Sequence, residues 1–167
     1  MTKLHLTMAV DYSQIFVEDS LRDKGYLDND MPALEYQRDK ISIGSNWFAI
    51  HTTGDICVPL VVEIVEDEPI FNEQQWDQIV KCSIDVPSGV LSIYEASGEN
   101  DIISIKLPSS GIYGAMIGYA DLEKPFISNG YTDDEGMFGD HYQLTLWKVD
   151  NPIPKQVVKY WANNPEA

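Results

Sequence analysis

The residues best suited to acid–base or metal chemistry in this chain are its three histidines, His5, His51 and His141. They do not occur at the H-x-x-H or H-E-x-x-H spacing that places two imidazoles on one face of a helix. The two cysteines, Cys57 and Cys82, stand in apolar strand-like runs without partners at zinc-ligand spacing. The sequence therefore predicts no catalytic residue and no metal ligand. A metal site or a Ser-His-Asp or Cys-His triad would have to be assembled by the fold.

Carboxylates gather in four short clusters that would suit cations or a basic protein. The clusters are "EIVEDE" at 63–68, "DND" at 28–30, "GEND" at 98–101 and "TDDEG" at 132–136. Calcium prefers oxygen ligands, but the EF-hand pattern D-x-[DN]-x-[DN]-G is absent. Glycoside hydrolysis needs two carboxylates at a fixed separation, which nothing in the sequence sets. Two interpretations remain: solvated loop tips that protect edge strands, or an acidic surface that meets a basic protein.

Aromatic residues flank some of these clusters, and protein interfaces use rigid aromatic anchors ringed by polar groups. Tyr131 and Phe138 enclose the "TDDEG" cluster, and Trp76 lies beside Asp77. Trp47 and Trp147 fall inside strand-like runs and are predicted to be core residues. The predicted partner-binding surface consists of the following acidic and aromatic residues: Asp28, Asp30, Glu66, Asp67, Glu68, Tyr131, Asp133, Asp134, Glu135 and Phe138.

The net charge limits the classes of partner. Asp and Glu number 27 against 11 Lys and Arg, which gives a formal net charge of −16. Nucleic-acid phosphates and anionic membranes both attract positive surfaces. The balance therefore predicts no binding to nucleic acid or membrane, and it favours a basic protein or metal ions as partners. No cofactor is predicted, and the oligomeric state does not follow from these features.

The start of the chain, "MTKLHLTMAV", has polar residues where a signal peptide needs an uninterrupted apolar stretch. No run of about 18 apolar residues occurs, so no membrane-spanning helix is predicted. Cys57 and Cys82 are predicted to be buried, reduced thiols rather than a disulfide. These observations together predict a cytoplasmic protein.

Short β-strands are the elements that would position these side chains. Residues 4–10 show the alternation of a half-buried strand, and similar short runs follow along the whole chain. No segment shows three clean helical turns. About eight to ten strands separated by turn signals predict an all-β fold, an antiparallel β-sandwich with at most short helical turns. A chain of 167 residues suits a single domain, residues 1–167.

Several segments give more specific predictions. Residues 34–37 are a possible strand, and residues 41–51 are a strand with a candidate bulge at Gly44. Residues 56–66 form a central strand, in which Pro59 must lie at a start, an edge or a bulge. A helical turn capped by Asn72 is predicted to follow.

The last part of the chain is predicted to contain a long acidic and aromatic loop, a strand and a tail. The loop covers residues 121–140, the strand covers residues 141–149, and the C-terminal tail covers residues 150–167. Within the tail, the run "KQVVKYWAN" favours a strand over a short helix.

One phrase occurs twice, as "SIDVPSGVL" at 83–91 and "SIKLPSSGI" at 104–112. Proline sets φ at the first corner of a turn, and glycine accepts the positive φ that closes it. The apolar residues before each turn are predicted to face one way. The nucleophile pattern G-x-S-x-G is absent, so Ser88 and Ser109 are predicted to be turn residues. The repeat is therefore predicted to be architectural.

The order of several segments resembles the competence protein J family, which includes the inhibitor of a DNA-entry nuclease. The segments are "LTMAVDYSQIFVED", "GYLDNDMPALEYQRDKISIG", "VPLVVEI", "CSIDVPSGVLSI", "IKLPSSGIYG" and "YQLTLWKV". The chain is also similar to small acidic immunity proteins that neutralise bacterial toxins. The resemblance covers residues 4–149 and carries over no individual binding residue. It implies a bacterial, non-enzymatic inhibitor.

Charge and resemblance together lead to one hypothesis. The protein would bind and neutralise a basic bacterial nuclease or toxin through acidic loops and exposed aromatic residues, because complementary charge speeds association. The alternative is a β-sandwich module that binds carbohydrate, a small ligand or calcium. An enzyme of unrecognised type is the third hypothesis.

Overall fold

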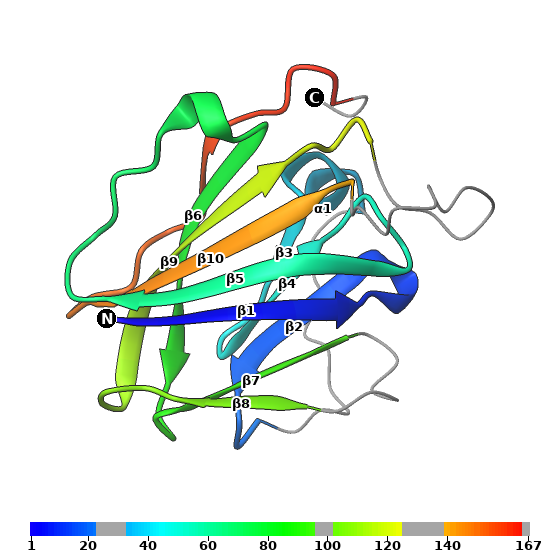
Figure 1. Cartoon of the computed structure of the whole chain (residues 1–167). Helices are drawn as coiled ribbons and strands as arrows, with labels where there is room; N and C mark the ends of the chain where they lie inside the picture. Colours follow the sequence, from blue (N-terminus) through cyan, green and yellow to red (C-terminus); the bar gives the residue numbers. More distant parts are fainter. Residues whose placement is uncertain (23–32, 96–101, 125–138, 165–167) are drawn as a thin grey trace.

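Two β-sheets face one another across a shared apolar core (Figure 1). The computed structural model describes residues 1–22, 33–95, 102–124 and 139–164. The larger sheet has the order β1 (Thr2–Ala9), β5 (Cys57–Val65), β10 (His141–Lys148), β9 (Gly111–Ala120), β6 (Gln78–Val86) and β11 (Gln156–Lys159). The smaller sheet has the order β3 (Ile41–Ile43), β4 (Trp47–His51), β2 (Gln14–Asp19), β7 (Val90–Glu95) and β8 (Ile103–Lys106). The predicted all-β sandwich is confirmed.

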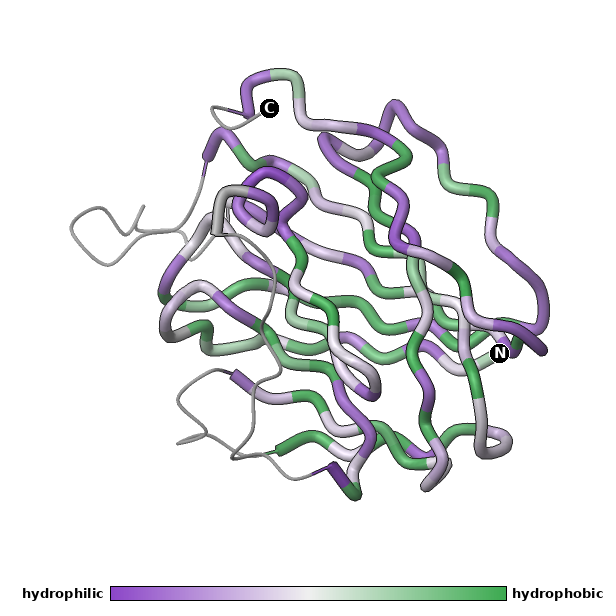
Figure 2. The backbone as a smooth tube through the Cα atoms, turned by 180° about the vertical axis from the view of Figure 1, so that it is seen from behind, coloured by the Kyte–Doolittle hydropathy of each residue, from purple (hydrophilic) through white to green (hydrophobic). Residues whose placement is uncertain are grey.

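The core forms because alternate residues of each strand point between the sheets. In β5, Val58, Leu60, Val62 and Ile64 are buried, while the residues between them are half-buried. The alternation of hydrophobic and hydrophilic residues is visible along the backbone in Figure 2. Tyrosines from β9 and β10 complete this core, and their rings meet edge to face at 5.6 Å in the pair Tyr119–Tyr142.

One strand pair departs from the antiparallel prediction. β5 and β10 run parallel, with Leu60 opposite Tyr142 and Val65 opposite Trp147. The other strand pairs described are antiparallel. Alternation with a period of two predicts which side chains of a strand share a face, but it does not predict the direction of the neighbouring strand. These two strands also lie far apart in sequence. The sequence pattern therefore could not reveal the parallel pair.

The repeated Pro-Ser-Gly phrase marks two corners where the chain changes sheet. The first corner joins β6 to β7, and the second joins β8 to β9. Gly89 closes the first turn with φ +70°, and its carbonyl accepts a hydrogen bond of 2.9 Å from Leu107 N. The two corners therefore bond to each other. The preceding apolar residues all lie in the core, as predicted: Ile84, Val86, Ile105 and Leu107.

Ser88 has the architectural role predicted for it. Its backbone N–H donates a 3.0 Å hydrogen bond to Asp19 Oδ1, and its hydroxyl donates to the same atom. Asp19 ends β2 and is 3% exposed. The turn is thereby fixed to the smaller sheet by a buried carboxylate.

Two sequence predictions were wrong in the segment that follows residue 32. The possible strand at 34–37 lies within a short helix, α1 (Ala33–Asp39). Four residues are too few to distinguish the two-residue period of a strand from the 3.6-residue period of a helix. Leu, Glu, Gln and Arg all favour helix. The expected bulge at Gly44 is the turn of a β3–β4 hairpin, closed by a 2.9 Å hydrogen bond from Gly44 N to Trp47 O.

Other local predictions are confirmed. Pro59 lies near the start of β5, opposite Thr7 of β1 and before the pairing with β10 begins at Leu60. Asn72 caps the helical turn η2 (Glu73–Gln75), with Oδ1 accepting a 3.1 Å hydrogen bond from Gln74 N. β10 and β11 lie where strands were predicted. Both cysteines are free thiols as predicted, but only Cys82 is buried, and Cys57 at the first position of β5 is half-buried.

The predicted loop at 121–140 connects β9 to β10, and most of it lies outside the described residues. Within the described ranges, no helix is long and apolar enough to cross a membrane.

Candidate functional site: an acidic connection and a polar pocket

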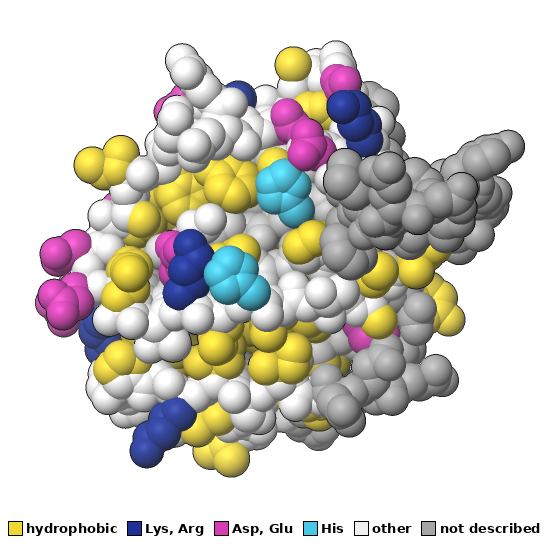
Figure 3. All heavy atoms as spheres, in the orientation of Figure 1, with side chains coloured by type: hydrophobic (Ala, Val, Ile, Leu, Met, Phe, Trp, Pro, Cys, Tyr) yellow, Lys and Arg dark blue, Asp and Glu magenta, His cyan; other side chains and the backbone are white. Residues whose placement is uncertain are grey.

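The structure describes three of the predicted partner-binding residues. Glu66, Asp67 and Glu68 are exposed in the connection that follows β5. Acidic side chains are visible at the left edge of Figure 3, where Figure 1 places the start of this connection. The remaining predicted residues lie outside the described ranges: Asp28, Asp30, Tyr131, Asp133, Asp134, Glu135 and Phe138.

Residues 66–77 form what we call the acidic connection between β5 and β6. Close to Glu66, Asp67 and Glu68 in this connection stands Ile70, which is 100% exposed. Glu68 forms an ion pair with Lys81 of β6. An apolar side chain with no protein contact next to carboxylates is typical of an interface anchor with a polar rim. Sequence reasoning overlooked Ile70, because an isoleucine in the sequence does not reveal its exposure.

The base of the acidic connection is fixed on the outer face of the larger sheet. Phe71 stacks on Trp76 with ring centroids 5.5 Å apart, and both pack against the cluster of Ile79, Met116 and Trp147. Trp76 lies so close to Gly118 that a Cβ there would approach its ring to 2.5 Å, so β9 needs glycine at this point. The second half of the connection is therefore anchored to the sheet by Phe71 and Trp76.

The prediction that the two tryptophans within strands are core residues is confirmed. Trp47 and Trp147 are buried, with 2% and 3% exposure. Each packs in a separate cluster, while their chain neighbours Phe48 and Leu146 point into the main core. Both indoles thus cover the outer faces of their sheets.

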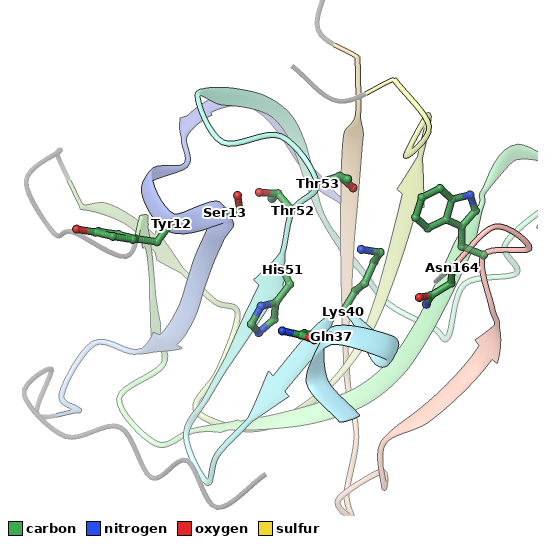
Figure 4. Close-up of a pocket in the computed structure, with 9 residues that line it drawn as sticks. Tyr12, Ser13, Gln37, Lys40, His51, Thr52, Thr53 and Asn164 are labelled. Carbon is green, nitrogen blue, oxygen red and sulfur yellow. The ribbon is translucent and has the colours of Figure 1, made fainter. Parts of the chain in front are cut away.

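A pocket of about 390 Å³ opens at the end of the sandwich where four segments meet (Figure 4). The segments are the turn η1 (Asp11–Ser13), the junction of α1 with β3, the end of β4 with its following loop, and the chain after β11. The lining residues are Tyr12, Ser13, Gln37, Lys40, His51, Thr52, Thr53, Trp161 and Asn164. Its volume falls in the range of small-molecule sites.

Hydrogen bonds between backbone groups connect these segments. His51 N donates to Lys40 O at 3.0 Å, and Thr52 N donates to Ser13 O at 2.8 Å. Tyr119 OH from the core donates to the same Lys40 carbonyl at 2.8 Å. The pocket walls are therefore held in place by the sheets themselves.

Lys40 places a positive charge in this pocket. Its ammonium lies 5.5 Å from the centroid of the Trp161 ring. No carboxylate of the described residues forms an ion pair with it. Burial lowers the pKa of Lys40, and the nearby Asp140 carboxylate opposes that decrease. Figure 4 shows the side chain between Thr53 and Asn164.

His51 contributes a neutral imidazole. Its Nε2 lies 2.7 Å from Ser42 Oγ, and its ring stacks on Tyr36 of α1 at 5.2 Å. Burial, together with the positive charge of Lys40, lowers the pKa of His51 to about 4. The imidazole is therefore uncharged at neutral pH. The neutral ring can donate and accept hydrogen bonds, but it adds no charge to the pocket.

Backbone strain concentrates at the same place. Among the described residues, four that are not glycine have positive φ: Tyr12, Ser13, Lys40 and Asp121. Three of these line the pocket, with φ values of 61°, 55° and 57°. Such conformations cost on the order of 1–3 kcal/mol each and gather at ligand sites. Tyr12 is also 81% exposed, and its ring points away from the pocket in Figure 4.

A buried carboxylate fixes the C-terminal wall of the pocket. Asp39 is 1% exposed and accepts hydrogen bonds from Arg38 Nε at 2.7 Å, Lys155 Nζ at 2.6 Å and Tyr160 OH at 3.1 Å. Burial alone would raise the pKa of Asp39, but the hydrogen bonds from Arg38 and Lys155 outweigh it and lower the pKa. The chain after β10 is thereby held against α1.

A second buried carboxylate fixes the loop after β4. Asp140 is fully buried and accepts a 2.8 Å hydrogen bond from Gly54 N, together with one from Tyr142 OH. Tyr142 OH in turn accepts a 2.9 Å hydrogen bond from Thr53 N. Thr53 and Gly54 are thus positioned by Tyr142 and Asp140.

Sequence reasoning missed the pocket altogether. The lining residues come from positions 12–13, 37–40, 51–53 and 161–164, which no spacing rule connects. His51 was noted only as one of three histidines, and the structure places it at the end of β4. Within the described ranges, no group of three or more His, Cys, Asp or Glu residues could hold a metal ion.

No protein-family model and no curated protein matches the chain. Two solved structures are similar to it in fold. One is ComJ from Bacillus subtilis, an inhibitor of the DNA-degrading activity of NucA, with a TM-score of 0.64, 13% identity, and coverage of 87% of this chain and 96% of that chain. The other is the product of crocagin biosynthetic gene J, with a TM-score of 0.57, 17% identity, and coverage of 88% and 98%. The chain therefore has the fold of ComJ, as its resemblance to the competence protein J family predicted.

Proposed function

We propose that this protein is a non-enzymatic inhibitor that binds and neutralises a basic nuclease or toxin in the cytoplasm. The observation that carries this proposal is the fold shared with ComJ over 87% of the chain, because ComJ is itself a nuclease inhibitor. The net charge of −16 supports it. A nuclease must present a positive surface to phosphates, and an acidic protein complements that surface.

The acidic connection is the described surface that suits such a partner best. Glu66, Asp67 and Glu68 attract a basic surface over distance and fix its orientation. Ile70 provides the apolar contact at the centre, because its whole side chain is available. Since Phe71 and Trp76 anchor the second half of the segment to the sheet, little conformational entropy is lost there on binding.

The acidic and aromatic residues outside the described ranges belong to the same proposal. Asp28, Asp30, Tyr131, Asp133, Asp134, Glu135 and Phe138 were predicted from the sequence on the same grounds of charge and aromatic anchoring. They would enlarge the partner-binding surface beyond residues 66–70.

Capture followed by an activity assay tests this function. The tagged protein is used to capture partners from a lysate of its native cell at low and high salt. Each stoichiometric partner is then purified and assayed for DNA degradation with and without the protein. We expect a basic partner that is held more weakly at high salt, and whose activity falls as the protein is added.

Charge reversal tests the surface. We expect the triple substitution Glu66→Lys, Asp67→Lys and Glu68→Lys to weaken binding at least about fivefold, or about 1 kcal/mol. The matched control reverses three exposed carboxylates elsewhere: Asp85, Glu123 and Asp150. Equal losses in both variants would show that only net charge matters. Captured partners without nuclease or toxin activity, or no partner in either salt, would refute the inhibitor function.

A further inference from the structure

The pocket combines features that a simple surface depression does not need. Strained backbone at Tyr12, Ser13 and Lys40 surrounds it, and two buried carboxylates, Asp39 and Asp140, hold its walls. A chain under no functional constraint would be expected to relax such a site, because three strained residues destabilise the folded state. The geometry is therefore typical of a binding site.

The charge of the pocket is opposite to that of the molecule. The protein carries 27 acidic residues against 11 basic ones, but the titratable side chains that line the cavity are Lys40, His51 and Tyr12. His51 is neutral, so Lys40 supplies the charge. Its ammonium lies over the Trp161 ring and lacks an ion-pair partner among the described residues. A half-buried cation of this kind favours an anionic ligand group.

We propose that this pocket binds a carboxylate group through the Lys40 ammonium. The carboxylate comes either from a small free acid or from the C-terminus of a peptide. The Ser13 hydroxyl and the Gln37 amide line the same cavity and supply neutral donors beside the cation. The Trp161 indole gives an apolar wall for the carbon skeleton behind the charged group.

A singly charged ligand suits the site better than a phosphate. One lysine compensates at most one negative charge, and the Asp140 carboxylate, which acts on Lys40 electrostatically, already weakens the positive potential that a ligand meets. A second ligand charge would remain uncompensated in a molecule whose own net charge is −16. This binding does not require that the protein inhibits a nuclease, so each proposal can fail without the other.

Titration of the wild-type protein with acetate and with acetamide gives the first test. The two probes have nearly the same size, and only acetate carries a charge. The reporter is the indole N–H signal of Trp161 in nuclear magnetic resonance spectra, with Trp47, Trp76 and Trp147 as internal references. We expect acetate to shift the Trp161 signal with saturation, and acetamide to bind at least about tenfold more weakly. Equal binding of both, or no saturable shift with acetate, would overturn the proposal.

Substitution of Lys40 gives the second test. We expect Lys40→Met to weaken acetate binding at least about tenfold and Lys40→Arg to retain most of it, because Arg keeps the charge. Lys106→Met is the matched control, since Lys106 is an exposed lysine on β8 that does not line the pocket. Unchanged binding in a folded Lys40→Met variant would contradict the assignment. If that variant does not fold, the comparison of acetate with acetamide still decides.

Three further probes separate the sources of the carboxylate. A short peptide with a free C-terminus is compared with the same peptide amidated at its C-terminus. If only the peptide with the free C-terminus binds about tenfold more tightly than acetate, the ligand is the C-terminus of a peptide. No gain would identify a small free acid. Inorganic phosphate that binds more tightly than acetate would overturn the choice of carboxylate.

Discussion

The acidic connection and the pocket place charge in opposite ways. In the acidic connection, Glu66, Asp67 and Glu68 are adjacent in sequence and exposed to water. In the pocket, Lys40 is half-buried, and its surroundings come from four distant segments. Water solvates the exposed carboxylates and leaves the fold nearly indifferent to them. Burial acts directly on the pocket residues, and it lowers the pKa of both Lys40 and His51.

This difference shows that the two kinds of site make different demands on the stability of the fold. A partner surface made of exposed charge costs the fold little, and it can change freely. A pocket with a half-buried cation, strained backbone and buried carboxylates depends on the rest of the structure.

The largest effect concerns the pH dependence of stability through His51. Its folded pKa of about 4 lies below the usual value of 6.5, so the folded state prefers the neutral imidazole. The stabilisation is complete above pH 6.5 and is lost as the pH falls towards 4. Urea unfolding should show that the wild type loses about 3 kcal/mol more than His51→Gln over this interval. His5→Gln is the control, because His5 lies exposed on β1. Parallel profiles for wild type and His51→Gln would contradict the burial of a neutral imidazole.

The next effect concerns Asp39. Asp39→Asn removes the anion that Arg38 and Lys155 share, and we expect the free energy of unfolding to fall by about 2 kcal/mol. The partial exposure of those cations, 39% and 23%, keeps the loss moderate. Glu63→Gln breaks the exposed pair with Lys3 and should cost less than about 1 kcal/mol. Equal losses in both variants, measured by urea unfolding, would show that the pocket wall does not depend on a buried charge.

The smallest effect concerns Ile70. Its side chain is already 100% exposed, so Ile70→Ser should change the free energy of unfolding by less than about 0.5 kcal/mol. Binding to a captured partner should nevertheless weaken, because an apolar anchor is lost. A large loss of stability would mean that Ile70 serves the fold rather than a partner.

Sequence patterns predicted the parts of the fold that depend on neighbouring residues. The alternation in residues 56–66, the cap at Asn72 and the two Pro-Ser-Gly corners are local features, and all occur as predicted. The misassigned segments, α1 and the β3–β4 hairpin, are short, so the choice between helix, bulge and turn falls to the surrounding structure. The acidic connection was identified because its charges are consecutive. Its anchor Ile70 was missed, since exposure is a property of the folded chain.

The sequence alone predicts a β-rich, acidic chain, because composition and period-two alternation do not depend on which distant segments meet. It also predicts the two turns that carry the chain between sheets. Only the tertiary structure decided that β5 and β10 run parallel and that Lys40, His51 and Trp161 share one cavity. Those arrangements depend on which distant strands pair and on how burial changes the cost of charge. Both the pairing of distant strands and the burial of charged groups arise only when the chain folds.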